Sequence, residues 1–192
     1  MFEKYNKVQQ AVLETTLRII IEKELQATSM ALIAKESGVS TGSIYHYFSS
    51  KEEIINELYR AIVLYNGEYV TRGMDAKEPI RTRFNRAWEK VFQVSLTHPE
   101  GFQFIEQYSF SPYINDAVKR ESYDGGWCKP MAALYAKAIE YQLFIEQEPA
   151  MMVQMHYGTM AYLVKGHLQK HFTLTDEVIE TVINSCWKSV AK

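Results

Sequence analysis

Two short helical segments joined by a glycine constrain the fold of this chain more than any other feature. The first segment, MALIAKES, follows Thr28 and Ser29, either of which can cap a helix, and it is expected to end at Gly38. Glycine readily adopts the left-handed conformation that closes a helix. Ser40 is then in place to cap the second segment, TGSIYHYF. Two short helices around a glycine turn predict a helix-turn-helix.

An amphipathic helix before this motif provides a surface for it to pack on. The expected helix runs from about Lys7 to Lys23 and repeats Leu13, Leu17 and Ile20 at steps of three and four residues. These three apolar side chains form one stripe, and the sequence therefore predicts a three-helix module. The residues expected to face inward in the two short helices are Ile33, Ala34, Val39, Ile44 and Phe48.

The outward face of the second short helix has an unusual composition. A solvated helix face usually mixes Glu and Lys, whereas this one has no acid and is followed by Lys51. Hydroxyl and aromatic side chains that can donate hydrogen bonds are suited to phosphates and base edges, and a glycine permits close approach. A helix-turn-helix used only for packing is the alternative interpretation. The outward residues are Thr41, Gly42, Ser43, Tyr45, His46 and Tyr47.

The rest of the chain is also expected to be helical, and the fold class predicted is all-α. Few prolines and glycines interrupt it, and it lacks alternating β-branched runs and hairpin dipeptides. Ser50 and Glu53 predict a capping box for a long fourth helix, and the turn-rich stretch 71–79 predicts a domain junction. SYDGGW is expected to be a loop. The later helices are expected at about 80–96, 98–107, 112–120, 129–144, 149–170 and 175–189.

Composition and charge exclude several classes of protein. The chain has 192 residues, with 21 Lys and Arg against 23 Asp and Glu, so it is not a polybasic nucleic-acid or membrane module. Two cysteines cannot form a disulfide framework or a CxxC site. With neither a signal peptide nor an apolar stretch of membrane-spanning length, a cytoplasmic protein without membrane contact is expected. No cofactor is predicted.

The sequence ATSMALIAKESGVSTGSIYHYFSSKEEI resembles the N-terminal signature of the TetR family of bacterial transcriptional repressors. The resemblance covers about residues 8–60. It implies a DNA-binding domain over 1–50, a connecting helix over 51–72, and a ligand-binding and dimerisation domain over 73–192. Where the family usually has glycine and an aromatic residue after the first helix, this chain has Glu24 and Leu25. The resemblance implies DNA contacts at Thr28, Ser29, Thr41, Gly42, Ser43, Tyr45, His46, Tyr47 and Lys51, with Thr41 to Ser43 facing bases and Thr28, Tyr45, Tyr47 and Lys51 holding phosphates.

Charge within the N-terminal module gives this interpretation modest support. Residues 1–51 contain six basic and five acidic side chains, a surplus of one. Affinity for DNA is therefore expected to depend on placed hydroxyl and backbone donors as much as on bulk charge.

Aromatic and methionine side chains are dense in the second half. Most are expected to be core, but large side chains with polar tips can also line a cavity for an apolar or aromatic small molecule. The candidate wall residues are Trp88, Phe92, Phe104, Tyr108, Trp127, Met131 and Tyr135.

Three histidines fall on one helix face when the expected helix at about 149–170 is continued by one residue. His156, His167 and His171 lie within about 60° of one another at 100° per residue. The spacing of His167 and His171 is also that of metal ligands, but no acid or cysteine accompanies them. Surface or interface histidines are favoured over a metal site, and a pH-sensitive interface lies between the two interpretations.

Small residues in the same helix and an apolar stripe in the last helix suggest an interface. Gly158, Ala161 and Gly166 permit close approach of another helix, although a single domain could also bury the stripe internally. The family resemblance implies a four-helix bundle made from these two helices of each of two subunits. The expected dimer contacts are Gly158, Ala161, Tyr162, Val178, Val182, Ile183 and Trp187.

The favoured function is a homodimeric repressor that binds a palindromic operator in double-stranded DNA and is released by a small-molecule effector. An enzyme is the alternative class, but GVSTGS lacks the Lys-Ser/Thr of a phosphate-binding loop, and neither paired acids nor a Ser/His/Asp set is evident. A helical protein-binding adaptor, or a ligand-binding protein without regulated DNA release, is the remaining alternative. DNA binding at moderate salt discriminates these alternatives.

Overall fold

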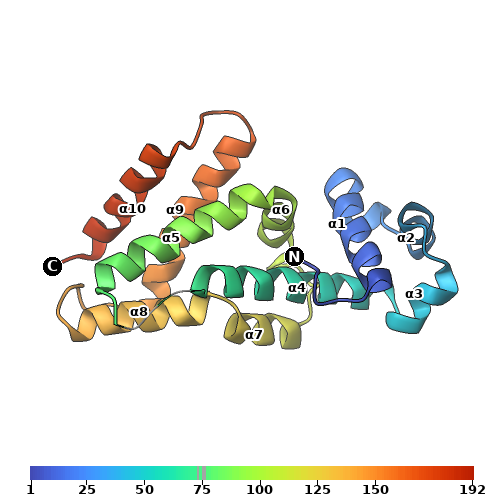
Figure 1. The fold of residues 1–192 in the computed structure, drawn as a ribbon, viewed down its shortest axis with the longest axis horizontal. Helices are drawn as coiled ribbons and strands as arrows, with labels where there is room; N and C mark the ends of the chain where they lie inside the picture. Colours follow the sequence, from blue (N-terminus) through green and yellow to red (C-terminus); the bar gives the residue numbers. More distant parts are fainter. Residues whose placement is uncertain (73, 75–76) are drawn as a thin grey trace. The chain divides into compact units, whose positions relative to one another are not determined.

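The computed structural model describes residues 1–72, 74 and 77–192, and confirms the all-α prediction. Ten helices form in this part of the chain, and an isolated bridge between Phe144 and Ala191 is its only β-pairing (Figure 1). Three residues of the expected turn 71–79, at 73, 75 and 76, lie outside the description. The helices are α1 (Lys7–Ala27), α2 (Met30–Ser37), α3 (Thr41–Tyr47), α4 (Lys51–Thr71), α5 (Ile80–Thr97), α6 (Pro99–Tyr108), α7 (Asp116–Gly125), α8 (Cys128–Glu140), α9 (Pro149–Leu168) and α10 (Asp176–Val190).

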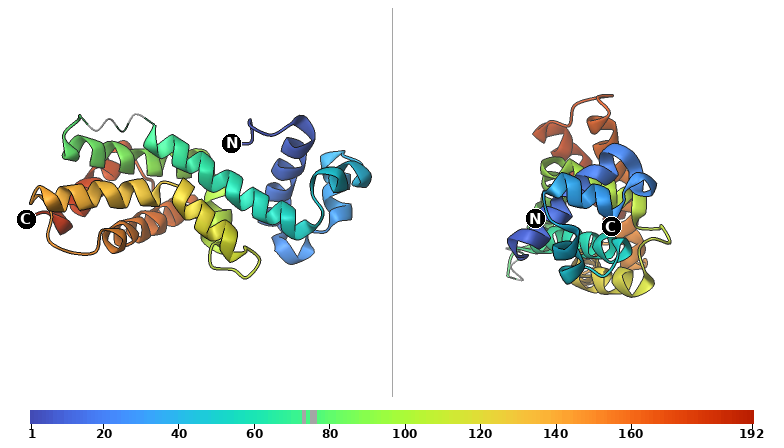
Figure 2. Two further views of the ribbon diagram at one scale, coloured as in Figure 1. Left: turned by 90° about the horizontal axis from the view of Figure 1, so that it is seen from below. Right: turned by 90° about the vertical axis from the view of Figure 1, so that its right-hand side faces the viewer.

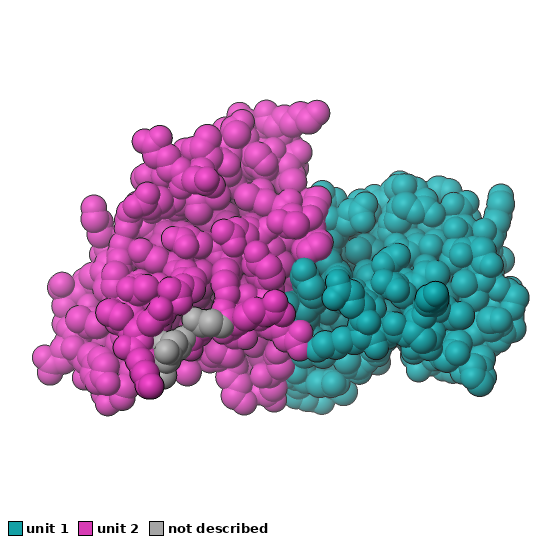
Figure 3. All heavy atoms as spheres, viewed as in Figure 1, with its two compact units in different colours: residues 1–65, 100–122 teal, residues 66–99, 123–192 magenta. Residues whose placement is uncertain are grey.

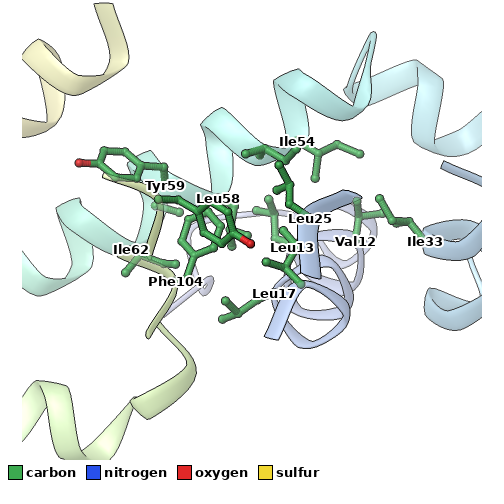
Figure 4. Packing of buried hydrophobic residues seen from close by; sticks show 14 of the residues in the cluster. Val12, Leu13, Leu17, Leu25, Ile33, Ile54, Leu58, Tyr59, Ile62 and Phe104 are labelled. Atoms are coloured by element: carbon green, nitrogen blue, oxygen red, sulfur yellow. The ribbon is translucent and has the colours of Figure 1, made fainter. Parts of the chain in front are cut away.

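Unit 1 consists of residues 1–65 and 100–122 (Figure 3). In its core, side chains from α1 meet those from α2 to α4 and α6, as Figure 4 shows for Leu13, Leu25, Ile33, Leu58 and Phe104. The predicted packing of the helix-turn-helix on the first helix is confirmed. Ile33, Ile44 and Phe48 share one buried cluster with the stripe of Leu13, Leu17 and Ile20, while Ala34 and Val39 pack at its margin.

Met1, Phe2 and Tyr5, from the segment before α1, pack in the same core. Phe2 is buried, and the Tyr5 hydroxyl donates to a carboxylate oxygen of Glu57 in α4 at 2.6 Å. Asn6 then caps α1, because its side-chain oxygen accepts from the backbone N–H groups of Val8 and Gln9 at 3.0 Å each. The N-terminal segment is thus fastened to α1 and α4.

The first helix is regular over the predicted range. Residues 7–23 are helical, and α1 continues to Ala27 only beyond a kink at Glu24, which has φ 66° and ψ 163°. This combination of angles is essentially restricted to glycine. Glu24 therefore adopts the backbone conformation that suits the glycine usually found here in the family that the sequence resembles.

Unit 2 consists of residues 66–99 and 123–192. Its helices α8 and α9 pack along one another, and α5 contacts α8, α9 and α10 (Figures 1 and 2). A close approach within this unit depends on Gly67 in α4, since a Cβ placed there would lie 2.8 Å from the carbonyl oxygen of Gly125. Unit 2 is thus a helical bundle in which α4 approaches Gly125 too closely at Gly67 to admit a larger side chain.

Three expectations differ from the structure. The helix expected at 129–144 ends at Glu140, and Phe144 instead forms the bridge to Ala191. The helix expected at 112–120 instead spans Asp116–Gly125, so SYDG of the expected loop is helical. Its start is set by tertiary contact, because the Asn115 backbone N–H donates to the Asn56 side chain at 2.8 Å and holds the preceding segment in place. Residues 100–122 were expected in the C-terminal domain, but they pack in unit 1. The functional division at residues 50 and 72 stays a prediction.

Candidate nucleic-acid interface

Caps and a glycine turn hold α2 and α3 of the helix-turn-helix. The Ser29 hydroxyl accepts from the Leu32 backbone N–H at 3.2 Å at the start of α2. Gly38 ends that helix with φ 70°, the left-handed conformation predicted for it. The Ser40 hydroxyl then accepts from the Ser43 backbone N–H at 3.1 Å and begins α3. Local hydrogen bonds therefore fix where both helices begin.

Only Ile44 of α3 is buried, and the rest of this helix is exposed. Tyr45 and Tyr47 are 52% and 38% exposed, which is unusual for side chains of this size. A Cβ added at Gly42 would meet no atom within 4 Å, so nothing within the chain demands glycine there. Thr41, Gly42, Ser43, Tyr45, His46 and Tyr47 thus form one exposed, acid-free surface, which we call the α3 face.

The start of α4 extends the α3 face with a basic residue. Lys51 is the first residue of this helix and is half-buried. The Ser50 hydroxyl accepts from the Glu53 backbone N–H at 3.1 Å, as predicted, but the Glu53 carboxylate accepts from the backbone and hydroxyl of Ser49 instead of Ser50. These bonds from Ser49 lower the pKa of Glu53. The Glu53 carboxylate therefore stays ionised and hydrogen-bonded to Ser49, close in sequence to Lys51.

Thr28 does not lie on the exposed surface where the family resemblance placed it. Its side chain is buried, and its hydroxyl donates to the Glu24 carbonyl oxygen at 3.0 Å, while its backbone N–H donates to the Leu25 carbonyl oxygen at 3.2 Å. Ser29, the next residue, is exposed. The structure therefore brings eight of the nine predicted DNA-contact residues to the surface of one unit and leaves Thr28 inside it.

The candidate ligand-binding residues divide between the two units. Phe104 and Tyr108 are part of the core of unit 1, with ring centroids 5.2 Å apart, so they do not join the other five candidates. The five in unit 2 are all buried: Trp88, Phe92, Trp127, Met131 and Tyr135. Sequence reasoning could not separate these groups, because all seven are apolar or aromatic residues at helical spacing.

A chain of hydrogen bonds runs through the aromatic core of unit 2. The Trp88 indole donates to the Tyr135 hydroxyl at 2.9 Å, and that hydroxyl lies 2.6 Å from Nδ1 of His156. Nε2 of His156 is 3.1 Å from the Ser189 hydroxyl, which donates to the Cys186 carbonyl. All these bonds can form together when Tyr135 donates to His156 and neutral His156 donates to Ser189. Burial lowers the pKa of His156 to about 4 and thereby favours the neutral ring.

The three histidines therefore have different surroundings, although they share a helical spacing. His156 is buried in the aromatic core rather than placed on a surface or interface. Nδ1 of His167 accepts from the Leu174 backbone N–H at 3.1 Å and so closes the turn after α9. His171 is exposed. Within the described residues, no three His, Cys, Asp or Glu side chains are grouped to hold a metal ion.

The residues expected at the dimer interface differ in their exposure. Gly158, Tyr162 and Val178 face outward, Tyr162 being 80% exposed. Ala161 and Ile183 are instead buried within unit 2. Gly166 permits close packing within unit 2, because a Cβ there would lie 2.5 Å from the Phe172 ring. Val182 and Trp187 are half-buried, and the Arg81 guanidinium lies 4.5 Å from the Trp187 ring centroid.

Met151 and Met155, which the expected set omitted, are 46% and 60% exposed on α9. Their spacing of four residues places them on one side of the helix, where a pattern search could have found them. With Gly158 and Tyr162 they form an outward strip, which we call the α9 strip.

Comparison with known proteins identifies matches along nearly the whole chain. The family model for bacterial regulatory proteins of the tetR family matches residues 12–58, and the tetracyclin repressor-like C-terminal domain matches residues 79–191. An uncharacterised HTH-type transcriptional regulator of Haemophilus influenzae is 23% identical over 94% of both chains. The repressor KstR2 of Mycobacterium tuberculosis is 30% identical over 57% of this chain and 58% of its own.

Solved structures share the fold. A TetR family transcription regulator from Marinobacter aquaeolei matches with a TM-score of 0.88 and 22% identity, covering all of both chains. No helix within the described residues is long and apolar enough to span a membrane.

Proposed function

This chain belongs to the TetR family of bacterial transcriptional regulators, and on that premise we propose that it is a repressor that binds a palindromic operator as a homodimer and releases it when a small apolar or aromatic ligand binds. The family supplies DNA binding through the helix-turn-helix. Repression, the operator, the dimer and the effector are the parts that we propose.

The α3 face carries the proposal for DNA recognition. It combines exposed hydroxyl and aromatic side chains with an open Gly42 and contains no acid, and the packing of unit 1 needs none of these features. We assign base contacts to Thr41, Gly42 and Ser43, and phosphate contacts to Tyr45, Tyr47 and Lys51, with His46 able to do either. Ser29 adds the capped start of α2, where backbone N–H groups favour a phosphate.

The α9 strip supports the proposed homodimer. Exposed apolar side chains on one side of a helix are suited to a matching helix, and Gly158 leaves room for a close approach. Val178 in α10 adds an exposed apolar residue. Two such subunits would read half-sites about 34 Å apart, or at a multiple of the helical turn, on a pseudo-palindrome.

The aromatic core of unit 2 supports the proposed effector site. Trp88, Phe92, Trp127, Met131 and Tyr135 offer apolar surface of the kind that lines small-molecule pockets. The single helix α4 contains residues of both units, so a change at its C-terminal end can bear on its N-terminal end. A ligand that favours the DNA-free state by about 1 to 3 kcal/mol would weaken operator binding about 5- to 150-fold.

The decisive experiment selects bound fragments from the source genome and measures affinity for them at several salt concentrations. Recovery of palindromic sites supports the repressor, and failure to bind any duplex at moderate salt favours the protein-binding adaptor.

Sedimentation tests the dimer. Gly158→Arg should give monomers that lose operator binding, while the packing of unit 1 stays intact. A parent protein that is monomeric at micromolar concentration contradicts the proposed dimer.

For the effector site, Trp127→Ala should impair release by effectors recovered in a compound screen while leaving operator binding nearly unchanged.

A further inference from the structure

Arg81, the second residue of α5, is a half-buried cation that no carboxylate balances. Arg18, Arg60 and Arg86 each form an ion pair with a glutamate. Among the described residues Arg81 forms no such pair, and its buried Nη1 atom has no hydrogen-bond partner there. Buried polar groups in folded proteins are almost always paired. The unpaired nitrogen therefore indicates a partner that this part of the chain does not supply.

Helix α10, which packs against α5 in unit 2, holds the guanidinium of Arg81 (Figure 1). Nη2 donates to the Asn184 side-chain oxygen, and Cζ lies 4.5 Å from the Trp187 ring centroid. An amide and an aromatic ring orient the cation without neutralising it. The first turn of a helix also disfavours positive charge, and burial lowers the pKa of Arg81. A bound water could pair Nη1, but only an anion would balance the charge.

Trp187 connects this cation to the aromatic core of unit 2. The ring centroid of Trp187 lies 5.1 Å from that of Phe84 and 4.7 Å from that of Phe144. Phe84 in turn packs against Tyr135, one of the proposed effector residues, with ring centroids 5.6 Å apart. A ligand with its apolar body among these rings would therefore place one end beside Arg81.

We propose that Arg81 binds the carboxylate of the effector, which is therefore a small organic acid with an apolar or aromatic body. This inference rests on the proposed function and names the chemical class of the ligand. The planar guanidinium fork matches the two oxygens of a carboxylate. Because Nη1 is closed to solvent, a carboxylate can reach it only when the packing around Arg81 opens. Such a ligand would favour a second arrangement of unit 2, as release of the operator requires.

Matched pairs of compounds test the requirement for a carboxylate. Phenylacetate, 2-naphthoate and octanoate each carry a carboxylate on an apolar body, and their primary amides are neutral counterparts of similar shape. In calorimetric titrations of the parent protein, at least one acid should bind about tenfold more tightly than its amide, because hydrogen bonds between charged groups are the stronger ones. The same acid should release a duplex that the parent selected from a randomised library, measured by fluorescence anisotropy.

Two variants of α5 assign the effect to Arg81. Arg81→Met removes the charge but keeps an unbranched side chain, so it should bind acid and amide with affinities within about twofold of each other and melt no earlier than the parent. Arg86→Met is the matched control, because Arg86 already pairs with Glu78 at 2.6 Å. It should retain the preference for the acid. Sedimentation of Arg81→Met should give the same oligomeric state as the parent.

Each outcome decides the inference. Equal affinity for acid and amide in every pair, or no binding by any compound, overturns it while the proposed function stands. An Arg81→Met protein that still prefers the acid, or that melts much earlier than the parent, also overturns it, since the guanidinium would then serve packing. Arg81→Met monomers would assign the balancing carboxylate to a second subunit and overturn it too. A parent that selects no duplex overturns the proposed function, while calorimetry still decides whether Arg81 binds the acid.

Discussion

The α3 face and the aromatic core of unit 2 contain similar side chains in opposite circumstances. Tyr45 and Tyr47 of α3 are exposed and lie outside the buried core, whereas Trp88 and Tyr135 are buried and hydrogen-bonded to one another. Packing within the fold explains the positions of Trp88 and Tyr135, but it does not explain the exposure of Tyr45 and Tyr47. Exposed residues that the fold does not need are therefore the stronger indication of an external partner, and the core residues need functional evidence of their own.

The largest expected effect separates the two regions by stability. Trp88→Ala removes a ring that packs on Phe84 and Trp127 and should lower the free energy of unfolding by about 3 to 5 kcal/mol, measured by urea denaturation. Tyr45→Ala on the α3 face is the control and should change it by no more than about 0.5 kcal/mol. Similar losses in both variants would break the comparison.

The next effect concerns pH and belongs to the aromatic core alone. Burial lowers the pKa of folded His156 to about 4, below its value of about 6.5 in the unfolded chain, so the unfolded state takes up the proton first as the pH falls. The contribution of neutral His156 is fully present above about pH 6.5 and is lost as the pH falls toward about 4, at about 1.4 kcal/mol per pH unit.

Urea unfolding at pH 7 and pH 5 checks this prediction. His156→Gln should remove about 2 kcal/mol of the difference between the two pH values, because the variant has no imidazole to protonate. Glutamine cannot reproduce the ring, so the variant should be less stable than the parent at pH 7. An unchanged pH dependence would show that other groups cause it.

A smaller effect should appear in the sequence preference of the α3 face. Thr41→Ala should change discrimination at one operator base pair by about 1 to 3 kcal/mol while leaving the unfolding free energy within about 0.5 kcal/mol. Selection of bound duplexes with parent and variant measures the change. The same preferred sequence in both proteins would remove Thr41 from the base contacts.

The smallest effect should be uniform across DNA sequences. Lys51→Ala should weaken binding to every duplex and flatten the plot of log affinity against log salt by about 0.9, the value for one phosphate contact. Lys137 provides a control in unit 2, where it pairs with Glu140 at 2.8 Å. Its replacement by alanine should leave the slope unchanged.

The sequence predicted the helix-turn-helix well because its signals are local. Ser40, Gly38 and Ser29 act on backbone groups within a few residues, so caps and turn could be placed without tertiary information. The stripe of α1 was predictable from periodicity for the same reason.

Features set by distant contacts could not be predicted. The start of α7 depends on Asn56, which lies 59 residues before Asn115, and the burial of Thr28 depends on a kink that Glu24 alone would disfavour. The separation of Tyr108 from Trp88 into different cores likewise follows from packing. Periodicity shows that a side chain is buried but not which neighbours surround it.

The Ser40–Ser43 pair at the start of α3 affects which base pairs the proposed operator could contain. The two hydroxyl oxygens are 2.8 Å apart, and either can be the donor. When Ser40 donates, the Ser43 proton is left for a base acceptor, and when Ser43 donates, its lone pair can accept from a base amino group. If Ser43 faces a base, the base pair opposite it therefore tolerates exchange between a hydrogen-bond acceptor and a hydrogen-bond donor at the contacted position.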